Sequence, residues 1–358
     1  MRAVVLFNRD LRVHDHPALA EAVRTAESVI PLFVVDDALL ATGFVVPNRA
    51  AFLVDSLVDL RAGLRARGGD LVVRRGDPVA EALALAAEFD AGVVHASADV
   101  TDFAQRREAR LADACAESGR RLALHSGVGV IPADELMTRS SGHYKVFTPY
   151  WRAWSNHPRR VVESAPRSVT LPLGVDPGAI PLASDLASGA PSPGLAPGGE
   201  GTARKLVFAW SRAHLADYGE QSDDLAGDVT SRFSPHLHFG TFSSLELVDR
   251  LEGREGGGPF ARQVCWRDFH QQTAFRFPAI ARADLHQRGR HWVEDEARLA
   301  AWAEGRTGLP IIDAGMRQLR QEGWMHNRAR LLVGSFLTKQ LRIDWRRGAA
   351  HFLDWLVD

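Results

Sequence analysis

At 358 residues, the chain is long enough for two domains, each able to bury its own core. Its hydrophobic fraction of 46% and charged fraction of 24% are ordinary for a globular protein and exclude a disordered chain, and no apolar run is long enough to span a membrane. The net charge of −1 does not by itself indicate a nucleic-acid-binding protein, and two cysteines, Cys115 and Cys265, allow neither a disulfide framework nor a paired-cysteine metal site, which is typical of the cytoplasm.

Residues 1–130 alternate short apolar strands with helical patterns. Strands are expected at residues 3–7, 29–35, 71–74, 92–95 and 121–125, and helices at residues 17–26, 48–67, 78–89 and 101–118. This order, with nearly continuous apolar strands, predicts a doubly wound parallel sheet of five strands. The first strand is followed directly by charged residues, which is unlike a signal peptide.

Two loops of this predicted domain could hold a ligand. In a doubly wound sheet ligands bind at the carboxyl ends of the strands, which directs attention to residues 8–10 and 76–78. The sequence has neither a glycine-rich dinucleotide motif nor a Walker phosphate motif. Asp77 is more simply interpreted as the cap of a helix that begins with Pro78.

The composition changes in the middle of the chain. From Ser164 to about Thr202, Pro, Gly, Ser and Ala dominate without a sustained period, which predicts an extended connector that is mobile near residues 189–201. We therefore expect an α/β domain at residues 1–130, an inter-domain connector at 131–202 and an all-α domain at 203–358.

The predicted all-α domain is rich in tryptophan and arginine. All nine Trp residues follow position 150, and between Arg262 and Arg347 the sequence has 16 Lys or Arg against 9 Asp or Glu. Such a region suits an aromatic cofactor or stacked bases, although large core side chains and solvated helix faces give the same composition. The densest part is GWMHNRAR at residues 323–330, where Gly323 is expected to separate a helix beginning near Pro310 from one at residues 324–339.

Three further patterns bear on chemistry. On the second of these helices Trp324, Asn327 and Arg328 would share one face, which suits a planar heterocycle with phosphates or an ordinary amphipathic helix. Thr230 and Ser231 precede a helix start and could bind phosphate or only cap that helix. The two-residue spacing of His236 and His238, without a third ligand nearby, predicts structural or surface histidines, and we expect no metal site.

Taken together, the sequence blocks resemble those of the cryptochrome/DNA photolyase family, with the closest likeness to the class I microbial photolyases that repair cyclobutane pyrimidine dimers. In chain order these blocks are LFNRDLRVHDHPAL, HYKVFTPYWRAW, TSRFSPHLHFG, WRDF, TGLPIIDAGMRQL, GWMHNRAR and IDWRRG. The resemblance implies an α/β antenna domain and a helical domain that encloses a folded FAD. The implied activity is light-driven splitting of dimers in damaged DNA by electron transfer, performed by a monomeric cytoplasmic enzyme.

The resemblance also assigns individual residues. The expected FAD contacts are Tyr218, Thr230, Ser231, Arg232, Phe233, Ser234, Gln263, Arg267, Asn327, Arg330 and Asp358. The residues expected to act on the lesion are Trp266, Gln263 and Asn327, and those expected to contact DNA are Trp266, Arg267, Asn327 and Arg328. Trp345 and Trp292 would be the middle and surface members of the chain that photoreduces the flavin.

The sequence departs from the family pattern at several positions. Gln263 stands where dimer-specific photolyases carry a glutamate, and a glutamine at this position resembles the (6-4) enzymes and animal cryptochromes. In contrast, Asn327 after His326 favours the dimer enzymes. Ser222 replaces an arginine that contacts DNA. The chain stops at Asp358, before the segment that completes the flavin pocket, so the helical domain is expected to be truncated at its C-terminal end.

Two further questions stay open at this stage. Gln105 and Arg106 replace the Asn and Glu of folate-binding members, which argues against a methenyl-folate antenna and leaves a deazaflavin antenna or none. The alternatives to a repair enzyme are a cryptochrome-type blue-light photoreceptor without repair activity and a truncated inactive member.

Overall fold

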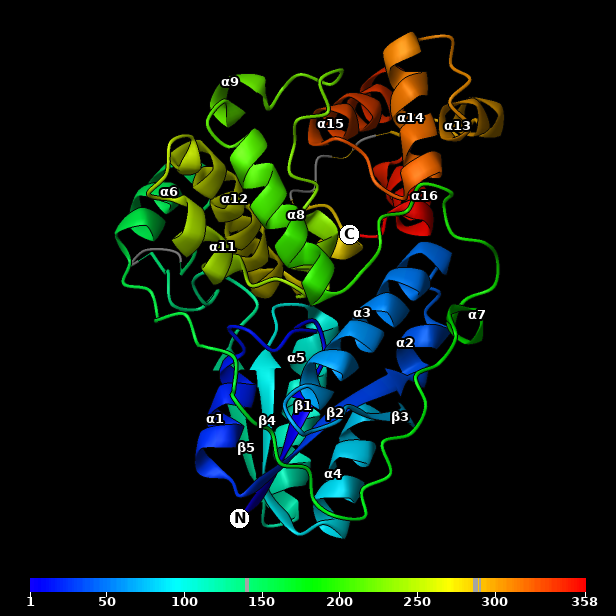
Figure 1. Ribbon diagram of the computed structural model, residues 1–358. Coiled ribbons are helices and arrows are strands. Elements are labelled where there is room, and N and C mark those ends of the chain that lie inside the picture. Colours follow the sequence, from blue (N-terminus) through cyan, green and yellow to red (C-terminus); the bar gives the residue numbers. More distant parts are fainter. Residues whose placement is uncertain (139–141, 286–288, 290) are drawn as a thin grey trace.

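The N-terminal half forms the predicted α/β domain. The structure, a computed structural model, describes residues 1–138, 142–285, 289 and 291–358 (Figure 1). Its five parallel strands lie in the order β3-β2-β1-β4-β5. The strands are β1 (Arg2–Phe7), β2 (Ser28–Asp36), β3 (Val72–Gly76), β4 (Ala91–Ala98) and β5 (Arg121–Ser126). The predicted doubly wound, five-stranded parallel sheet is therefore confirmed.

Helices cover both faces of this sheet. The predicted helices are α1 (Pro17–Thr25), α3 (Pro47–Arg65), α4 (Pro78–Glu88) and α5 (Asp102–Glu117), and a short helix α2 (Asp37–Ala41) was not expected. Because side chains alternate along a strand, Ala3, Val5 and Phe7 of β1 share a core with α1 and α3, whereas Val4 and Leu6 share one with α4 and α5. These two cores make the sheet a rigid base.

The first turn of α4 is held as the sequence indicates. The carboxylate of Asp77 accepts hydrogen bonds from the backbone N–H groups of Val79 and Ala80, both at 3.0 Å, and Pro78 occupies the first turn. Asp77 is therefore a helix cap, as expected.

A helix lies inside the stretch that was expected to be a connector. In α6 (Phe147–Asn156), Phe147, Tyr150 and Trp154 are buried in the same core as Trp210 and Phe260 of the helical half. Their spacing of three and four residues is a helical signal that the prediction of a connector overlooked. We propose that residues 131–156 belong to the helical domain and that the connector begins near residue 157.

The rest of the connector is attached to the α/β domain. It contains α7 (Ala183–Leu186), whose side chains pack on the core that includes α3. The backbone carbonyls of Thr170 and Pro177 each accept a hydrogen bond of 2.8 Å, from the N–H groups of Val29 and Val73. These bonds fix this part of the connector to β2 and β3.

The helical half lies above the carboxyl ends of the strands (Figure 1). Its α-helices are α8 (Glu200–Ala213), α9 (Tyr218–Gln221), α10 (Ser234–His238), α11 (Ser244–Leu251), α12 (Gly257–Arg276), α13 (Glu296–Ala303), α14 (Pro310–Glu322), α15 (Asn327–Ser335) and α16 (Trp345–Trp355). A 3₁₀ turn (Pro278–Ala281) follows α12, and a π turn (Phe336–Gln340) follows α15. No helix within the described ranges is long and apolar enough to cross a membrane.

The helix pair around Gly323 differs from the prediction in one respect. Helix α14 begins at Pro310, and Gly323 ends it with a left-handed φ of 62°, as expected. Helix α15, however, begins at Asn327 because the His326 ring accepts a hydrogen bond from the N–H of Arg328 at 3.1 Å and caps the helix. Trp324 therefore precedes the helix and does not share a helical face with Asn327 and Arg328, so that prediction was wrong.

A partly buried carboxylate on the α/β domain, that of Glu108, gives a testable pH dependence. Burial raises the pKa of Glu108 to about 7; the hydrogen bond of 2.9 Å from the N–H of Asp99 opposes this shift, and the Asp99 charge adds to it. Because the pKa is higher in the folded protein, the free energy of unfolding should fall as pH rises from about 4.3, the ordinary value, through 7. In Glu108→Gln, the free energy of unfolding measured with denaturant should no longer fall across that pH window. An unchanged slope would contradict the raised pKa of Glu108.

Candidate functional site

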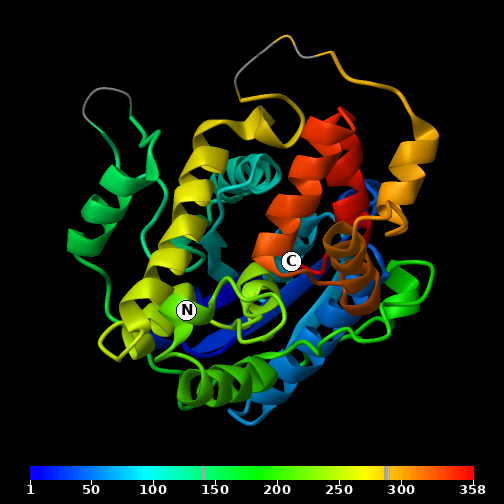
Figure 2. The same cartoon turned by 90° about the horizontal axis from the view of Figure 1, so that it is seen from above.

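The predicted cofactor and DNA contacts come from four places in the helical half. They lie in the segment from α9 to α10, on α12, on α15 and at Asp358, and α12 and α15 stand on opposite sides of the middle of the view from above (Figure 2). The chain ends between the two domains (Figure 1). The fold thus brings residues that are far apart in the sequence into one part of the molecule.

The loop before α10 is shaped by its larger side chains. Arg232 has a left-handed φ of 53°, forms ion pairs with Asp228 and Glu322 at 2.8 and 2.6 Å, and lies 4.5 Å from the ring centre of Trp324. Phe233 is buried in edge-to-face contact with Trp210. Arg232 and Phe233 therefore fix the loop, and their own side chains contact protein.

Two polar atoms near this loop have no partner. The Thr230 hydroxyl oxygen and Oδ1 of Asp358 are both buried and accept or donate no hydrogen bond within the described part of the chain. A buried polar group without a partner destabilises a fold by roughly 1–3 kcal/mol. Two such groups in one region are therefore fitted to a polar ligand.

Asp358 joins the loop to α15. Arg330 donates from Nη2 to Oδ2 of Asp358 at 2.9 Å and from Nε to the carbonyl of Met325 at 2.8 Å. Ser234 accepts a hydrogen bond of 3.2 Å from the indole N–H of Trp324. Burial opposes ionisation of Asp358, but the charge and hydrogen bond of Arg330, together with Ser234 and His238, outweigh it, so the pKa of Asp358 is lowered. The carboxylate is therefore ionised at neutral pH.

Tyr218 lies at the aromatic edge of this region. Its ring meets Trp210 and Phe260 edge to face, with centroids 5.6 and 5.3 Å apart. Burial, with a smaller effect of the Asp223 charge, raises the pKa of Tyr218 to about 12. The phenol is therefore neutral and able to donate a hydrogen bond.

The outer face of α12 presents Gln263 and Trp266. Gln263 is exposed, and Trp266 retains 36% of its surface. The Trp266 ring stacks on Phe147 of α6, with centroids 3.7 Å apart and planes at 6°, and His270 lies 5.6 Å away on the next turn. The sequence analysis missed Phe147 and His270 as partners of Trp266, although the spacing of four residues could have indicated His270.

Arg267 points in a different direction. Its guanidinium donates to the carbonyls of Val128 and Leu237 at 2.8 and 2.9 Å and to the hydroxyl of Ser244 at 3.0 Å. Burial lowers its pKa to about 10. Arg267 thus ties α12 to neighbouring segments, and these contacts lend no support to the cofactor and DNA roles predicted for it.

Arg267 and Asp268 are only weakly paired. The two side chains approach only to 3.9 Å. Asp268 instead accepts hydrogen bonds from the N–H groups of Val130 and Ile131 at 3.0 and 3.1 Å and from the indole of Trp154 at 2.9 Å. Asp268 is therefore a structural residue that holds α6 against α12.

The residues at the start of α15 are open to solvent. Asn327 and Arg328 are exposed, and Arg328 forms an ion pair with the exposed carboxylate of Asp223, with Nε and Oδ1 3.1 Å apart. An exposed ion pair of this kind contributes about 0–1 kcal/mol, so it can exchange its carboxylate for a phosphate at little cost.

Trp345 and Trp292 lie on adjoining segments. The indole N–H of Trp345 donates to Oδ1 of Asp284 at 2.6 Å, and the Arg346 guanidinium lies 4.8 Å from its ring centre. The N–H of Val293 donates to the carbonyl of Arg342 at 2.8 Å, which places the segment of Trp292 beside the segment that leads to Trp345. This arrangement fits two members of one electron chain.

The histidine pair and the antenna positions are also defined. The His236 ring is buried with Nδ1 2.8 Å from the Thr241 hydroxyl, and within the described ranges no group of three or more His, Cys, Asp or Glu could hold a metal ion. Gln105 donates to the carbonyl of Val100 at 2.9 Å, and Arg106 pairs with Asp102 at 2.8 Å. Both antenna positions are thus engaged with their own helix start.

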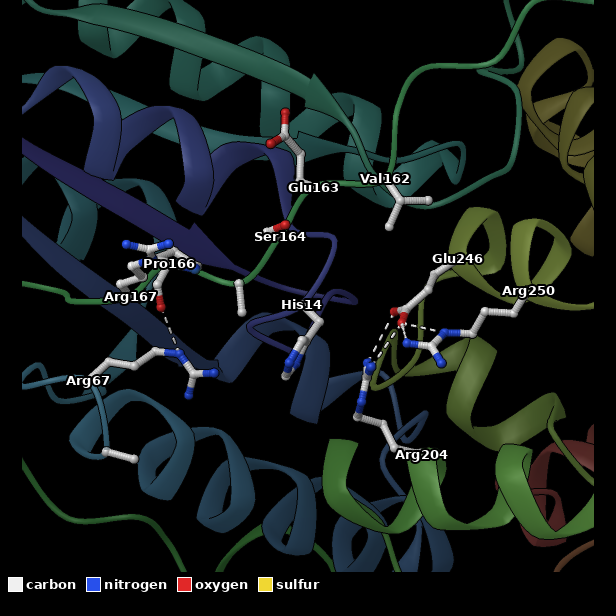
Figure 3. Close-up of a pocket in the computed structure, with 12 residues that line it drawn as sticks. His14, Arg67, Val162, Glu163, Ser164, Pro166, Arg167, Arg204, Glu246 and Arg250 are labelled. Carbon is white, nitrogen blue, oxygen red and sulfur yellow. Dashed lines mark hydrogen bonds and ion pairs between the residues drawn. The ribbon is translucent and has the colours of Figure 1, made fainter.

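A surface pocket of about 640 Å³ lies elsewhere, between the two domains (Figure 3). His14 and Arg67 line it from the α/β domain, and Arg204, Glu246 and Arg250 line it from the helical half. Glu246 pairs with both Arg204 and Arg250, at 3.0 and 2.7 Å, as the dashed lines show. Because Arg204 and Arg250 already share the carboxylate of Glu246, the pocket favours a ligand less than the region around Thr230 and Asp358 does.

A doubly wound α/β domain followed by a helical domain with this cluster of indoles and polar groups is the architecture of the cryptochrome and photolyase class. Residues 3–169 match the family model described as DNA photolyase, and residues 260–358 match that of the FAD binding domain of DNA photolyase. The chain therefore belongs to the DNA photolyase family. The second match identifies FAD as its cofactor, as predicted.

Individual relatives agree with this assignment. The chain is 50% identical to the deoxyribodipyrimidine photo-lyase of Streptomyces griseus, over 99% of this chain and 79% of that protein. It is 36% identical to a cryptochrome DASH of Natronomonas pharaonis, over 99% of this chain and 80% of that protein. The chain thus spans about four-fifths of the length of both relatives.

Solved structures agree as well. A bacterial class III photolyase from Agrobacterium tumefaciens superposes with a TM-score of 0.93 at 31% identity, over 100% of this chain and 76% of that one. An archaeal photolyase from Sulfolobus tokodaii, described with two FAD molecules and a novel light-harvesting cofactor, gives a TM-score of 0.86 at 29% identity, over 100% of this chain and 79% of that one. The predicted fold class is confirmed by these likenesses.

Proposed function

We propose that this protein splits cyclobutane pyrimidine dimers in DNA with light, using bound FAD. The observation that carries the proposal is the partly exposed indole of Trp266, which lies on a helical domain of the FAD-binding photolyase type. An aromatic side chain that remains exposed while stacked on protein is suited to receive a base drawn out of the duplex. We further propose that the protein acts as a cytoplasmic monomer, which is consistent with two free cysteines that are both buried.

The residues around Thr230 and Asp358 fit the cofactor. The unpartnered Thr230 hydroxyl, with Ser231 and Ser234, would hold its phosphates and adjoining groups, and the Arg330–Asp358 pair would fix a polar edge. The buried ring of Phe233 and the partly buried ring of Tyr218 would support the loop that carries these hydroxyls. When bound, FAD supplies the light-driven transfer of an electron to the lesion.

The protein's own groups would position the damaged DNA. Trp266 would stack on the extruded dimer, and Arg328 would exchange Asp223 for a phosphate. Gln263 is exposed on the same helix as Trp266 and offers an amide that donates and accepts hydrogen bonds. An amide has no ionisable proton, so Gln263 would orient the lesion without protonating it, as Asn327 would.

The proposal is tested by supplying the chain with FAD, reducing the flavin chemically, and illuminating a DNA duplex that carries one thymine dimer. Dimers should disappear under blue light and persist in the dark. If reduced flavin is bound and the dimers survive illumination, repair of this lesion is excluded. That outcome, combined with a light-dependent change in a partner or in oligomeric state, would favour the photoreceptor alternative that Gln263 suggests.

Trp345→Phe provides a separate prediction for the electron chain. Phenylalanine is much harder to oxidise than tryptophan and lacks the N–H that donates to Asp284, so photoreduction of bound flavin should slow. Dimer splitting by chemically reduced enzyme should remain intact. Absorbance during illumination measures the first effect, and Trp151→Phe on α6, whose ring stacks on Trp154, is the control. Equal loss of both activities would identify Trp345 as a core residue only.

A further inference from the structure

The indole of Trp266 is held in one orientation before any ligand binds. Phe147 lies parallel to it at 3.7 Å and 6°, and Phe269 meets both rings edge to face, at 5.5 Å from Trp266 and 5.8 Å from Phe147. The parallel pair lies nearly face to face, and the edge-to-face contacts with Phe269 are a favourable geometry of aromatic pairs. One face of the indole is therefore covered by protein, whereas 36% of the residue surface is still open.

Phe147 itself is well anchored. It is only 6% exposed and begins α6, which Asp268 fixes to α12 through the indole of Trp154 at 2.9 Å. The guanidinium of Arg262 lies 5.6 Å from the Phe147 ring centre. The ring under Trp266 is thus part of the rigid scaffold, and it comes from a segment far from Trp266 in the sequence.

A fixed indole binds a flat base more tightly than a mobile one, because the rotational freedom of the side chain is already lost before binding. We propose that Phe147 is a positioning residue. It holds the indole of Trp266 in the orientation in which that indole stacks on an extruded dimer base. This inference depends on the proposed function, in which the dimer stacks on Trp266. Phe147 contacts neither the DNA nor the flavin in this account and acts only through the indole.

The test is a double-mutant cycle with a duplex that carries one thymine dimer and the same duplex undamaged, both measured in the dark. Phe147→Leu keeps apolar volume but removes the ring, and it should weaken dimer binding about two- to tenfold, the range of an aromatic pair. Affinity for undamaged DNA should stay within about twofold, because phosphate contacts dominate it. Phe147→Tyr, which restores the ring, should bind the dimer as the parent protein does.

The decisive comparison is made with Trp266→Ala. If Phe147 acts through the indole, Phe147→Leu should have no further effect on dimer binding in that background. The inference is overturned if both backgrounds lose affinity by the same factor, if Phe147→Tyr is as weak as Phe147→Leu, or if undamaged DNA loses as much affinity as damaged DNA.

Two outcomes separate this inference from the proposed function. If Trp266→Ala leaves dimer affinity unchanged, the dimer does not stack on Trp266. In that case both the stacking in the proposed function and the positioning role of Phe147 fail. If Trp266→Ala weakens binding and Phe147→Leu does not, only the positioning role of Phe147 fails. Thermal unfolding midpoints of Phe147→Leu and Phe147→Tyr within a few degrees of the parent establish that the variants compared are folded.

Discussion

Replacement of Asp15 by alanine should lower the free energy of unfolding by about 3–5 kcal/mol, the usual effect of removing one partner of a buried ion pair. The Asp15 carboxylate is fully buried and accepts from Arg160 at 2.5 and 2.8 Å, from the N–H of Glu163 at 2.9 Å and from the hydroxyl of Ser243. It thereby joins the first loop of the α/β domain to the connector and to the start of α11. Burial opposes its ionisation, but Arg160 outweighs burial, so the pKa of Asp15 is lowered.

Backbone conformation adds to this effect. Asp15 has a φ of 47°, in the left-handed region that aspartate and asparagine tolerate better than alanine does. Chemical denaturation measures the change. Asp37→Ala is the control, because its ion pair with Arg75 is exposed and should contribute less than about 1 kcal/mol. Equal losses in the two variants would contradict the role of Asp15 as the link between domains.

Replacement of Trp266 by alanine should weaken binding of dimer-containing DNA by roughly 1–3 kcal/mol, which is about five- to 150-fold, the value of one stacked base. The indole is the largest open aromatic surface on the outer face of α12 that already rests on a ring, and alanine removes that surface entirely. Affinity for undamaged duplex should change little, because no base is extruded from it.

A matched control is an exposed aromatic outside the proposed site. Phe208 of α8 is 63% exposed, and Phe208→Ala should leave dimer affinity within about twofold. Fluorescence anisotropy titrations in the dark compare the two variants. Unchanged dimer affinity in Trp266→Ala, or an equal loss for undamaged DNA, would refute the stacking role.

The sheet was predictable because each strand is a short apolar run bounded by charged or turn residues. The helix pair around Gly323 was predictable in the same way, from a proline at the start of α14 and a glycine at its end. The start of α15 was not, because His326, an unusual cap residue, supplies the capping nitrogen. The local rule succeeded where Pro310 and Gly323 mark the ends of α14, and it failed where a histidine ring caps α15.

The types of residue in the site were predictable from the sequence, but the directions of their side chains were less so. The pattern around Trp266 indicated an indole and a guanidinium on α12, yet Arg267 turns inward to the carbonyls of Val128 and Leu237. The Phe147–Trp266 stack joins segments that only the tertiary fold brings together. Neither contact leaves a periodic signal, because side-chain partners across helices are set by packing rather than by sequence spacing.

The proposed flavin site rests most directly on the buried hydroxyl of Thr230, and titration of Thr230→Val with FAD tests it. Valine removes an oxygen that has no partner, so the flavin-free protein should gain about 1 kcal/mol of stability, while its affinity for FAD should fall about tenfold. An ordinary structural threonine would not give these opposite changes. The proposed flavin site is contradicted if Thr230→Val binds FAD as tightly as the parent chain does. It is also contradicted if the parent chain binds no FAD.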